Sequence, residues 1–177
     1  MTWLIFVFVG LALFGSIYWM KPSARDQRLS ELRMAAIRSG LHIRQHTFKV
    51  DAARNGVRDD ITATGYTLTL PPPPHGEKQR QALLFRIVGQ QGWETAGLPE
   101  GWAWHDLPQA KDRDASLAKA EQLGPLLVRL LSSMDDELQM LEVFENRIVL
   151  FPSEQKNASA EKYLKVLDGV RLMIEPD

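Results

Sequence analysis

The chain has 177 residues, a formal net charge of −1 at pH 7 and no cysteine. A charge so close to zero argues against a general nucleic-acid-binding protein, because such proteins carry a large excess of basic residues. The lack of cysteine excludes a cysteine nucleophile and agrees with a reducing compartment.

The first segment is uniformly apolar. Residues 3–20 carry no charged side chain, and Lys21 follows directly. As a helix this run would rise roughly 27 Å, close to the about 30 Å hydrocarbon core of a bilayer. Aromatic residues at both ends, Trp3 and the pair Tyr18–Trp19, are typical of membrane interfaces. The sequence therefore predicts a transmembrane anchor at residues 1–20, with the span over 3–20.

Two alternatives fit this run less well. A cleaved signal peptide needs a basic start and small residues at its cleavage site, and this segment has neither. A buried helix of a soluble core is shorter and less uniformly apolar. Basic residues follow the run, and positive residues stay in the cytoplasm. We therefore expect a single-pass protein of the bacterial inner membrane, with the N-terminus outside and the C-terminal domain in the cytoplasm.

Two groups of residues accompany this predicted anchor. Small side chains on one face of the span predict contact with another membrane helix, although small residues are common in such helices: Ala12, Gly15 and Ser16. Basic side chains after the span set the topology and are expected to face anionic lipid: Lys21, Arg25, Arg28, Arg33 and Arg38.

The remaining chain predicts a basic juxtamembrane helix over residues 21–40 and a cytoplasmic domain over 41–177. Ser23 can cap a helix that begins at Ala24, and Gly40 can end it. The later pattern predicts an α+β fold with a mainly antiparallel sheet and two to three packed helices. Strands are expected at 41–50, 61–70, 82–88, 138–144 and 147–151, and helices from Pro125 and from a cap at Asn157 or Ser159.

Candidate catalytic groups are few. His42 and His46 could share a metal, but no third ligand is evident, so exposed or core-satisfied histidines are the simpler interpretation. The carboxylate clusters at Asp59–Asp60, Asp112/Asp114 and Asp135–Glu137 coincide with element boundaries, where acidic residues cap helices and turns. No glycine-rich phosphate loop or nucleophile motif is present. We expect no catalytic residue, no cofactor and no metal.

Two features predict partner binding. Pro71–Pro74 would form an extended polyproline segment, which either binds an aromatic groove or serves as a rigid spacer. Three tryptophans, Trp93, Trp102 and Trp104, lie in a stretch rich in glycine and proline, and tryptophan is enriched at interface anchors. If these indoles are exposed, they form a docking surface for a partner; the alternative is that they pack in the core.

The junction after the apolar run resembles a family of bacterial single-span proteins. Its matching residues are Pro22, Ser23, Arg25, Asp26 and Arg28, in the segment KPSARDQRLSELR. Members sometimes carry the label of the YajC-type preprotein translocase accessory subunit, which implies one amino-terminal span and a cytoplasmic tail. The double-glycine β motif that follows the basic segment in YajC is not present here.

Together these patterns favour a non-enzymatic, membrane-anchored adaptor or accessory subunit that docks another inner-membrane or peripheral protein. Its partners would include no nucleic acid and no small-molecule substrate. One alternative is a membrane-bound enzyme whose site involves His42, His46 or Asp59–Asp60. Another is a protein that binds anionic lipid through its basic helix.

Overall fold

The structure, a computed structural model, describes residues 2–19, 21–49, 60–71, 83–89, 95, 97–98, 100–105, 123–134 and 137–174. The described helices are α1 (Thr2–Trp19), α2 (Ala24–Arg38), one over residues 123–131, and α4 (Ala160–Ile174). The strands are β1 (His42–Lys49), β2 (Asp60–Thr69), β3 (Leu83–Val88), β4 (Ala103–His105), β5 (Leu138–Phe144) and β6 (Arg147–Pro152). The fold is therefore α+β.

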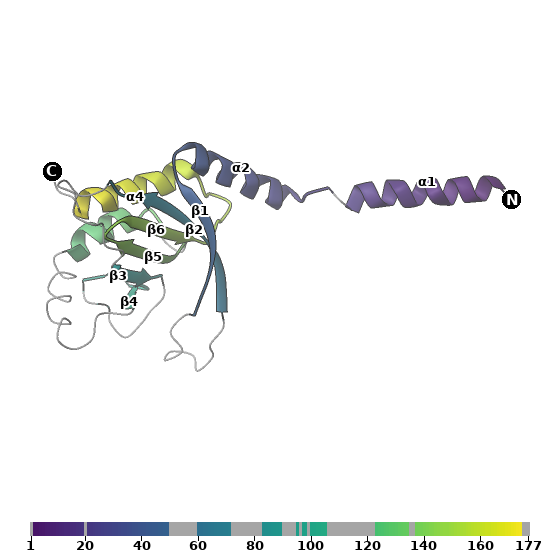
Figure 1. Cartoon of the computed structure of the whole chain (residues 1–177). Coiled ribbons are helices and arrows are strands. Elements are labelled where there is room, and N and C mark those ends of the chain that lie inside the picture. Colours follow the sequence, from purple (N-terminus) through teal and green to yellow (C-terminus); the bar gives the residue numbers. More distant parts are fainter. Residues whose placement is uncertain are drawn as a thin grey trace.

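The six described strands form one antiparallel sheet in the order β1-β2-β6-β5-β3-β4. β5 and β6 form a hairpin that turns at Glu145–Asn146, as the sequence predicts. The ladder between β2 and β6 covers only Tyr66–Thr69 of β2, so β1 and the first half of β2 continue past it as a two-stranded ribbon (Figure 1). β1 and β4 are the two edge strands.

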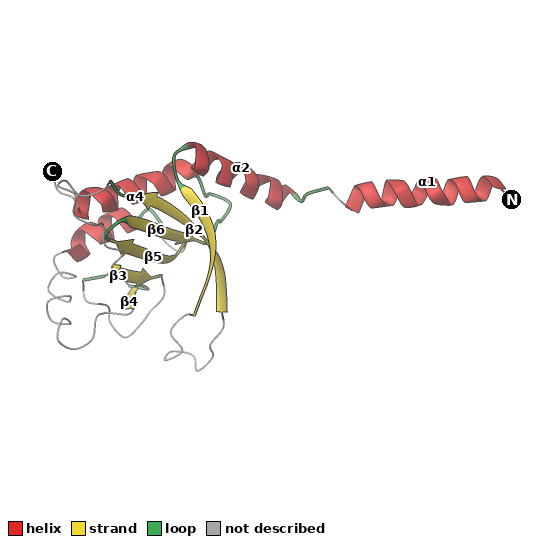
Figure 2. Cartoon of the chain, in the orientation of Figure 1, coloured by secondary structure: helices red, strands yellow, loops and turns green. Residues whose placement is uncertain are grey.

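One face of the sheet is covered by α2, α4 and the helix over residues 123–131 (Figure 2). Alternating strand residues point to this face because successive side chains of a strand lie on opposite sides. They meet the apolar stripes of the helices in the main core. Its largest fully buried side chains include Tyr66, Ile87, Leu127, Leu131, Leu141, Ile148, Leu150, Tyr163 and Leu167.

A second buried cluster lies on the opposite face of the sheet: Ala63, Val88, Met140, Val149 and Phe151. Gly65 belongs to this face, because a Cβ built there would lie 2.9 Å from Cε1 of Phe151 and 3.1 Å from Cγ1 of Val149. The absence of a side chain at Gly65 allows the Phe151 ring to lie over the backbone of β2. The edge of the His46 ring contacts the same phenylalanine, with ring centroids 5.5 Å apart.

The helix ends match the sequence prediction closely. Ser23 caps α2 by accepting a hydrogen bond from the Asp26 amide, and the Asp26 carboxylate accepts one from the Ser23 amide, which completes a capping box. Gly40 follows α2 with a φ of 84°, a conformation that other L-residues adopt at a steric cost. Ser159, one of the two expected caps, accepts a hydrogen bond from the Lys162 amide at the start of α4.

Two local features differ from what the sequence indicates. The apolar spacing of the closing helix predicts that Leu172 points inward, but it is 59% exposed, because it lies on the side of α4 opposite to Val170, while Met173 and Ile174 pack against the core. β4 was not predicted, since three residues are too few to show an alternation of polar and apolar side chains. Its pairing with β3 places Trp104 opposite Ile87.

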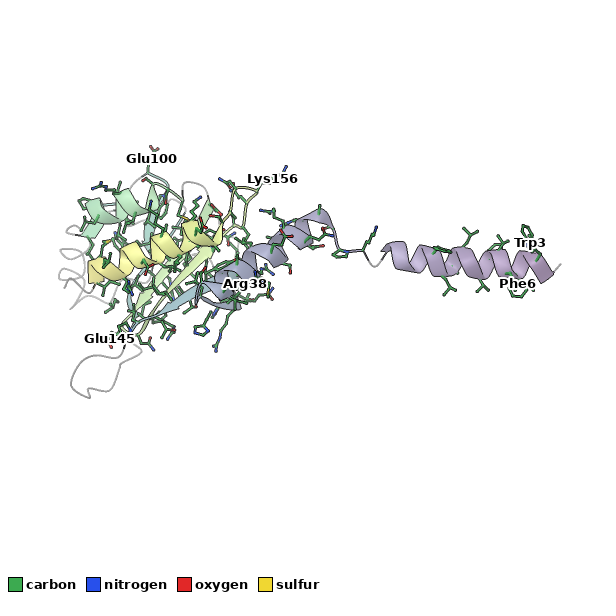
Figure 3. The ribbon with its side chains drawn as sticks, turned by 90° about the horizontal axis from the view of Figure 1, so that it is seen from above. Trp3, Phe6, Arg38, Glu100, Glu145 and Lys156 are labelled. Atoms are coloured by element: carbon green, nitrogen blue, oxygen red, sulfur yellow. The ribbon has the colours of Figure 1, made fainter. Side chains whose placement is uncertain are left out.

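The predicted transmembrane anchor is wrong, and with it the expected single-pass inner-membrane location. No helix in the part of the chain that the structure describes is long and apolar enough to cross a membrane. α1 extends away from the rest of the chain (Figure 1), and its described large apolar side chains, such as Trp3 and Phe6, are exposed (Figure 3).

Candidate functional site

Glu154 is the centre of a polar network between α2, β2 and the segment after β6. Its carboxylate accepts hydrogen bonds from Nε of Arg33 at 3.0 Å, from Nη2 of Arg33 at 2.7 Å and from the Tyr66 hydroxyl at 2.6 Å. Nη2 of Arg33 also donates to the Thr64 hydroxyl at 3.0 Å. The Glu154 side chain is only 11% exposed, so these contacts take the place of water around the charge.

The contacts of Glu154 determine its ionisation. Burial alone would raise the pKa of this carboxyl group, but the hydrogen bonds from Arg33 and Tyr66 outweigh it, and the pKa of Glu154 is lowered. The Arg33 pKa is raised in turn, chiefly by its hydrogen bonds to Glu154. The two residues therefore form a stable ion pair. Glu154 also has a φ of 51°, an uncommon conformation for a residue with a side chain.

A second buried carboxylate, Glu137, lies between β5 and α4. It accepts hydrogen bonds from Nζ of Lys162 at 2.6 Å and from the hydroxyl of Tyr163 at 2.5 Å. The Glu137 side chain is 3% exposed, so this ion pair is more deeply buried than that of Glu154. Burial first, and the hydrogen bond to Glu137 second, raise the pKa of Tyr163. This hydroxyl therefore stays protonated and acts as a donor.

A third pair lies on the other face of the sheet. Nε of Arg86 in β3 donates to the Glu142 carboxylate in β5 at 2.7 Å, and Nη2 of Arg86 approaches the same oxygen at 2.6 Å. Glu137, Glu142 and Glu154 are thus each paired with a cation of the same chain. Loss of either partner of such a pair would leave a buried charge without compensation, so these contacts fix the position of each carboxylate.

The edge of β1 is a polar, exposed feature of the described domain. Among the described strands, β1 has a ladder partner on one side only, β2. Its side chains alternate, and His42, Arg44 and His46 are exposed on one face. The unpaired N–H and C=O groups of an edge strand form a template on which another extended chain can pair.

The structure separates the basic residues that the sequence grouped together. Arg33 points into the domain and pairs with Glu154, and Nη2 of Arg28 donates to the Glu154 carbonyl at 3.0 Å. Arg25 lines a cavity, and Lys21 and Arg38 are exposed. Arg28 and Arg33 therefore hold α2 against the segment that follows β6.

The other predicted site residues have varied outcomes. Trp102 and Trp104 are 7% and 6% exposed and belong to the main core, so they form no exposed docking surface. The ring of Trp104 meets that of Phe85 edge to face, with centroids 5.7 Å apart. Trp93 lies outside the described residues. Burial of these indoles follows the alternative interpretation, in which a loop-rich segment folds its aromatic residues beneath itself.

His42 and His46 both lie on β1 and are exposed, and no cluster of three metal-ligating side chains is present in the described ranges. Asp59 lies outside the described residues, and the side chain of Asp60 is not described. In α1, Gly10 and Gly15 have open space around their Cα atoms. The packing face predicted for Ala12, Gly15 and Ser16 stays a prediction.

Sequence reasoning missed the structural roles of Glu137 and Glu154. Glu137 was assigned to an acidic element boundary, and Glu154 was not singled out. The weak signal for Glu154 is its place two residues after the end of β6 at Pro152, where a carboxylate lies close to the sheet. No sequence pattern shows that a residue near position 33 will reach it, because the partners are 121 positions apart.

Comparison with known proteins finds no matching family model, no matching curated protein and no matching solved structure. The resemblance at Pro22–Arg28 therefore stays a prediction.

Proposed function

We propose that this protein is a non-enzymatic adaptor whose domain binds an extended, acidic segment of a partner protein along the free edge of β1. The observation that carries the proposal is the eight-residue edge strand His42–Lys49, which pairs with β2 and with no other described strand. Addition of a strand to such an edge is a recurring mode of peptide recognition.

The charge around β1 favours an acidic ligand. From Met34 to Val50 the sequence contains three Arg or Lys residues, two His residues and no Asp or Glu. Asp60 is the register partner of Lys49, so the uncompensated positive charge is that of Arg38 and Arg44. Both side chains are exposed, and Figure 3 shows Arg38 at the end of α2 that leads into β1. Opposite charge next to an edge strand aids association and selects the partner.

The internal ion pairs support a binding role for this edge. Glu137, Glu142 and Glu154, the buried carboxylates of the described domain, are each within 2.7 Å of a cation of this chain. Because each of these carboxylates is already paired, none of them neutralises the positive charge next to β1, and none acts there as an acid or a base. The Arg33–Glu154 pair holds α2, which leads into β1, and the Lys162–Glu137 pair holds α4. The position at which β1 begins is therefore fixed, and a strand that is already positioned loses less entropy on binding.

The test uses two synthetic ten-residue peptides, one alternating Thr and Glu and one alternating Thr and Lys. Binding to the purified full chain is measured by fluorescence anisotropy in a nonionic detergent, because α1 exposes apolar side chains. The Thr–Glu peptide is expected to bind at least ten times more tightly than the Thr–Lys peptide. Amide hydrogen exchange in β1 should slow when the Thr–Glu peptide is bound, since its outward N–H groups acquire partners.

Two charge-reversal variants localise the effect. Arg44→Glu should raise the dissociation constant of the Thr–Glu peptide about tenfold, which corresponds to a loss of about 1.4 kcal/mol in binding free energy. Arg129→Glu is the matched control. Arg129 is an exposed residue of the helix over 123–131, and its substitution changes the net charge by the same amount as Arg44→Glu. Equal binding of both peptides, or equal effects of the two variants, would contradict the proposal. A concentration-dependent dimer that protects β1 without peptide would instead identify a second copy as the occupant and also contradict it.

A further inference from the structure

A cavity lies between the first turns of α2 and the segment that joins β6 to α4. Its volume is about 830 Å³, and it is lined by Ala24, Arg25 and Arg28 from α2 and by residues 154–157. This volume lies within the usual range of roughly 300–1,000 Å³ for small-molecule sites. In Figure 3, Lys156 lies beside the start of α2, while Arg38 marks the opposite end of that helix. The cavity is therefore distinct from the β1 edge.

Three cations border this cavity: Arg25, Arg28 and Lys156. Among the described residues of its lining, Glu154 is the one acidic residue, and its carboxylate is already paired with Arg33 at 2.7 Å. The cavity therefore has a strong positive excess. The side-chain amides of Gln155 and Asn157 add neutral hydrogen-bond donors to the lining.

Arg28 is held in place without being neutralised. Its guanidinium donates to the backbone carbonyls of Glu154 and Gln155. Carbonyl oxygens orient the guanidinium but leave its full positive charge, and its remaining N–H groups can still donate. Arg25 and Lys156 are exposed and make no described ion pair. The cavity thus combines one fixed cation with two that can adjust to a ligand.

The cations of the lining, rather than the end of the helix, define this site. The capping box between Ser23 and Asp26 already occupies the Asp26 amide in the first turn of α2. The groups of the cavity that carry full positive charge are the side chains of Arg25, Arg28 and Lys156. Two guanidinium groups and an ammonium match the three oxygens of a phosphate monoester better than the two of a carboxylate.

From this geometry we infer that the cavity binds a phosphate monoester, carried either by a free small molecule or by the headgroup of a lipid. The site is independent of the proposed docking edge, and neither depends on the other. The aliphatic stems of Arg25 and Lys156 and the methyl group of Ala24 supply apolar surface next to the cations, where the organic part of the ligand would lie.

The test titrates the full chain with glycerol 3-phosphate and with water-soluble dihexanoyl phosphatidic acid, below its micelle concentration, in nonionic detergent by calorimetry. Binding of at least one probe with a dissociation constant below 5 mM is expected. Equal constants indicate that the phosphate alone is recognised, whereas at least tenfold tighter binding of the lipid indicates a lipid source; both outcomes support the inference. Failure of both probes to bind below that concentration would overturn it.

Charge-reversal variants locate the site. Lys156→Glu and Arg25→Glu should each raise the dissociation constant at least tenfold, since each replaces attraction by repulsion. Lys165→Glu is the control because Lys165 is exposed on α4 and outside the cavity lining, and its effect should be less than twofold. Thermal unfolding of each variant without ligand checks the fold, and two independent variants keep the test valid if one is unstable. Equal effects of Lys156→Glu and Lys165→Glu would show non-specific attraction and overturn the inference.

Discussion

The rings of Tyr66 and Tyr163 lie 4.9 Å apart, centroid to centroid, at an angle of 59°, and their hydroxyl groups donate to two different glutamates. Tyr66 donates to Glu154 at 2.6 Å and Tyr163 to Glu137 at 2.5 Å. This contact joins the two buried ion pairs through the centre of the core. It links β2 to α4, and through Arg33 and Lys162 it connects α2 and α4, two of the helices that cover the sheet.

Because the two tyrosines donate to separate acceptors, we expect their hydroxyl groups to contribute independently to the free energy of unfolding. Tyr66→Phe and Tyr163→Phe each keep the ring contact and remove one hydrogen bond to a charged group, which costs about 1.5–3 kcal/mol of unfolding free energy. The double variant should show the sum of the two effects within about 0.5 kcal/mol. Urea unfolding measures all three. A coupling above about 1 kcal/mol would show that the hydroxyl groups act through one shared network.

The lowered pKa of Glu154 predicts how stability depends on acid. The unfolded reference value is 4.5, and the folded pKa is lower, so the stabilisation is complete above pH 4.5 and is lost as the pH falls through the folded pKa. Glu154→Gln should be less stable than the wild type at pH 7, by about 2 kcal/mol because the pair is partly exposed. The difference should shrink steadily below pH 4.5.

Unfolding curves from pH 7 to pH 2 check this prediction. Glu161→Gln is a suitable control, because Glu161 is exposed in the first turn of α4. A constant difference between wild type and Glu154→Gln over the whole range would contradict the assignment of the acid dependence to Glu154.

The backbone conformation of Glu154 predicts that a glycine variant at this position is more stable than an alanine variant. Glu154 adopts a φ of 51°, a left-handed conformation that costs an L-residue about 1 kcal/mol and glycine almost nothing. Both Glu154→Ala and Glu154→Gly lose the carboxylate, but only the alanine variant keeps the backbone strain. Glu154→Gly should therefore be the more stable of the two by about 1 kcal/mol. Thermal melts in parallel decide the order, and an alanine variant that melts higher would disprove the strain at this position.

Two glycines should respond differently to alanine. A Cβ at Gly89 would lie 1.9 Å from the backbone oxygen of Leu138, and a β-strand backbone cannot move away without breaking its ladder. Gly89→Ala should lower the free energy of unfolding by about 3 kcal/mol or more. At Gly169 the nearest atom is Cδ2 of Leu130, at 2.4 Å.

Leu130 can rotate, and Gly169 lies within α4, where alanine favours the helix by about 1 kcal/mol. Gly169→Ala should therefore change stability by less than about 1 kcal/mol. Chemical unfolding of the two variants tests the contrast. Similar losses at both positions would show that the Leu130 side chain is held as rigidly as the backbone of Leu138.

Local chemistry in the sequence determined most of the elements. The capping residues Ser23 and Ser159 mark the starts of α2 and α4 because a hydroxyl oxygen satisfies a free amide there. The alternation in β2 identifies Tyr66 as a core residue, since every second side chain of a strand faces the helices. These signals act between neighbours in the chain, so they can be read without knowing the fold.

The tertiary structure alone decided which polar groups became buried pairs and which strand was left at an edge. Arg33 and Glu154 are 121 positions apart, and both look like ordinary surface residues until α2 packs on the sheet. β1 became an edge because the order of strands places it outside β2. The buried ion pairs and the edge position of β1 depend on which surfaces meet when the chain folds. The order of residues along the chain does not give the distance between segments that are remote in sequence.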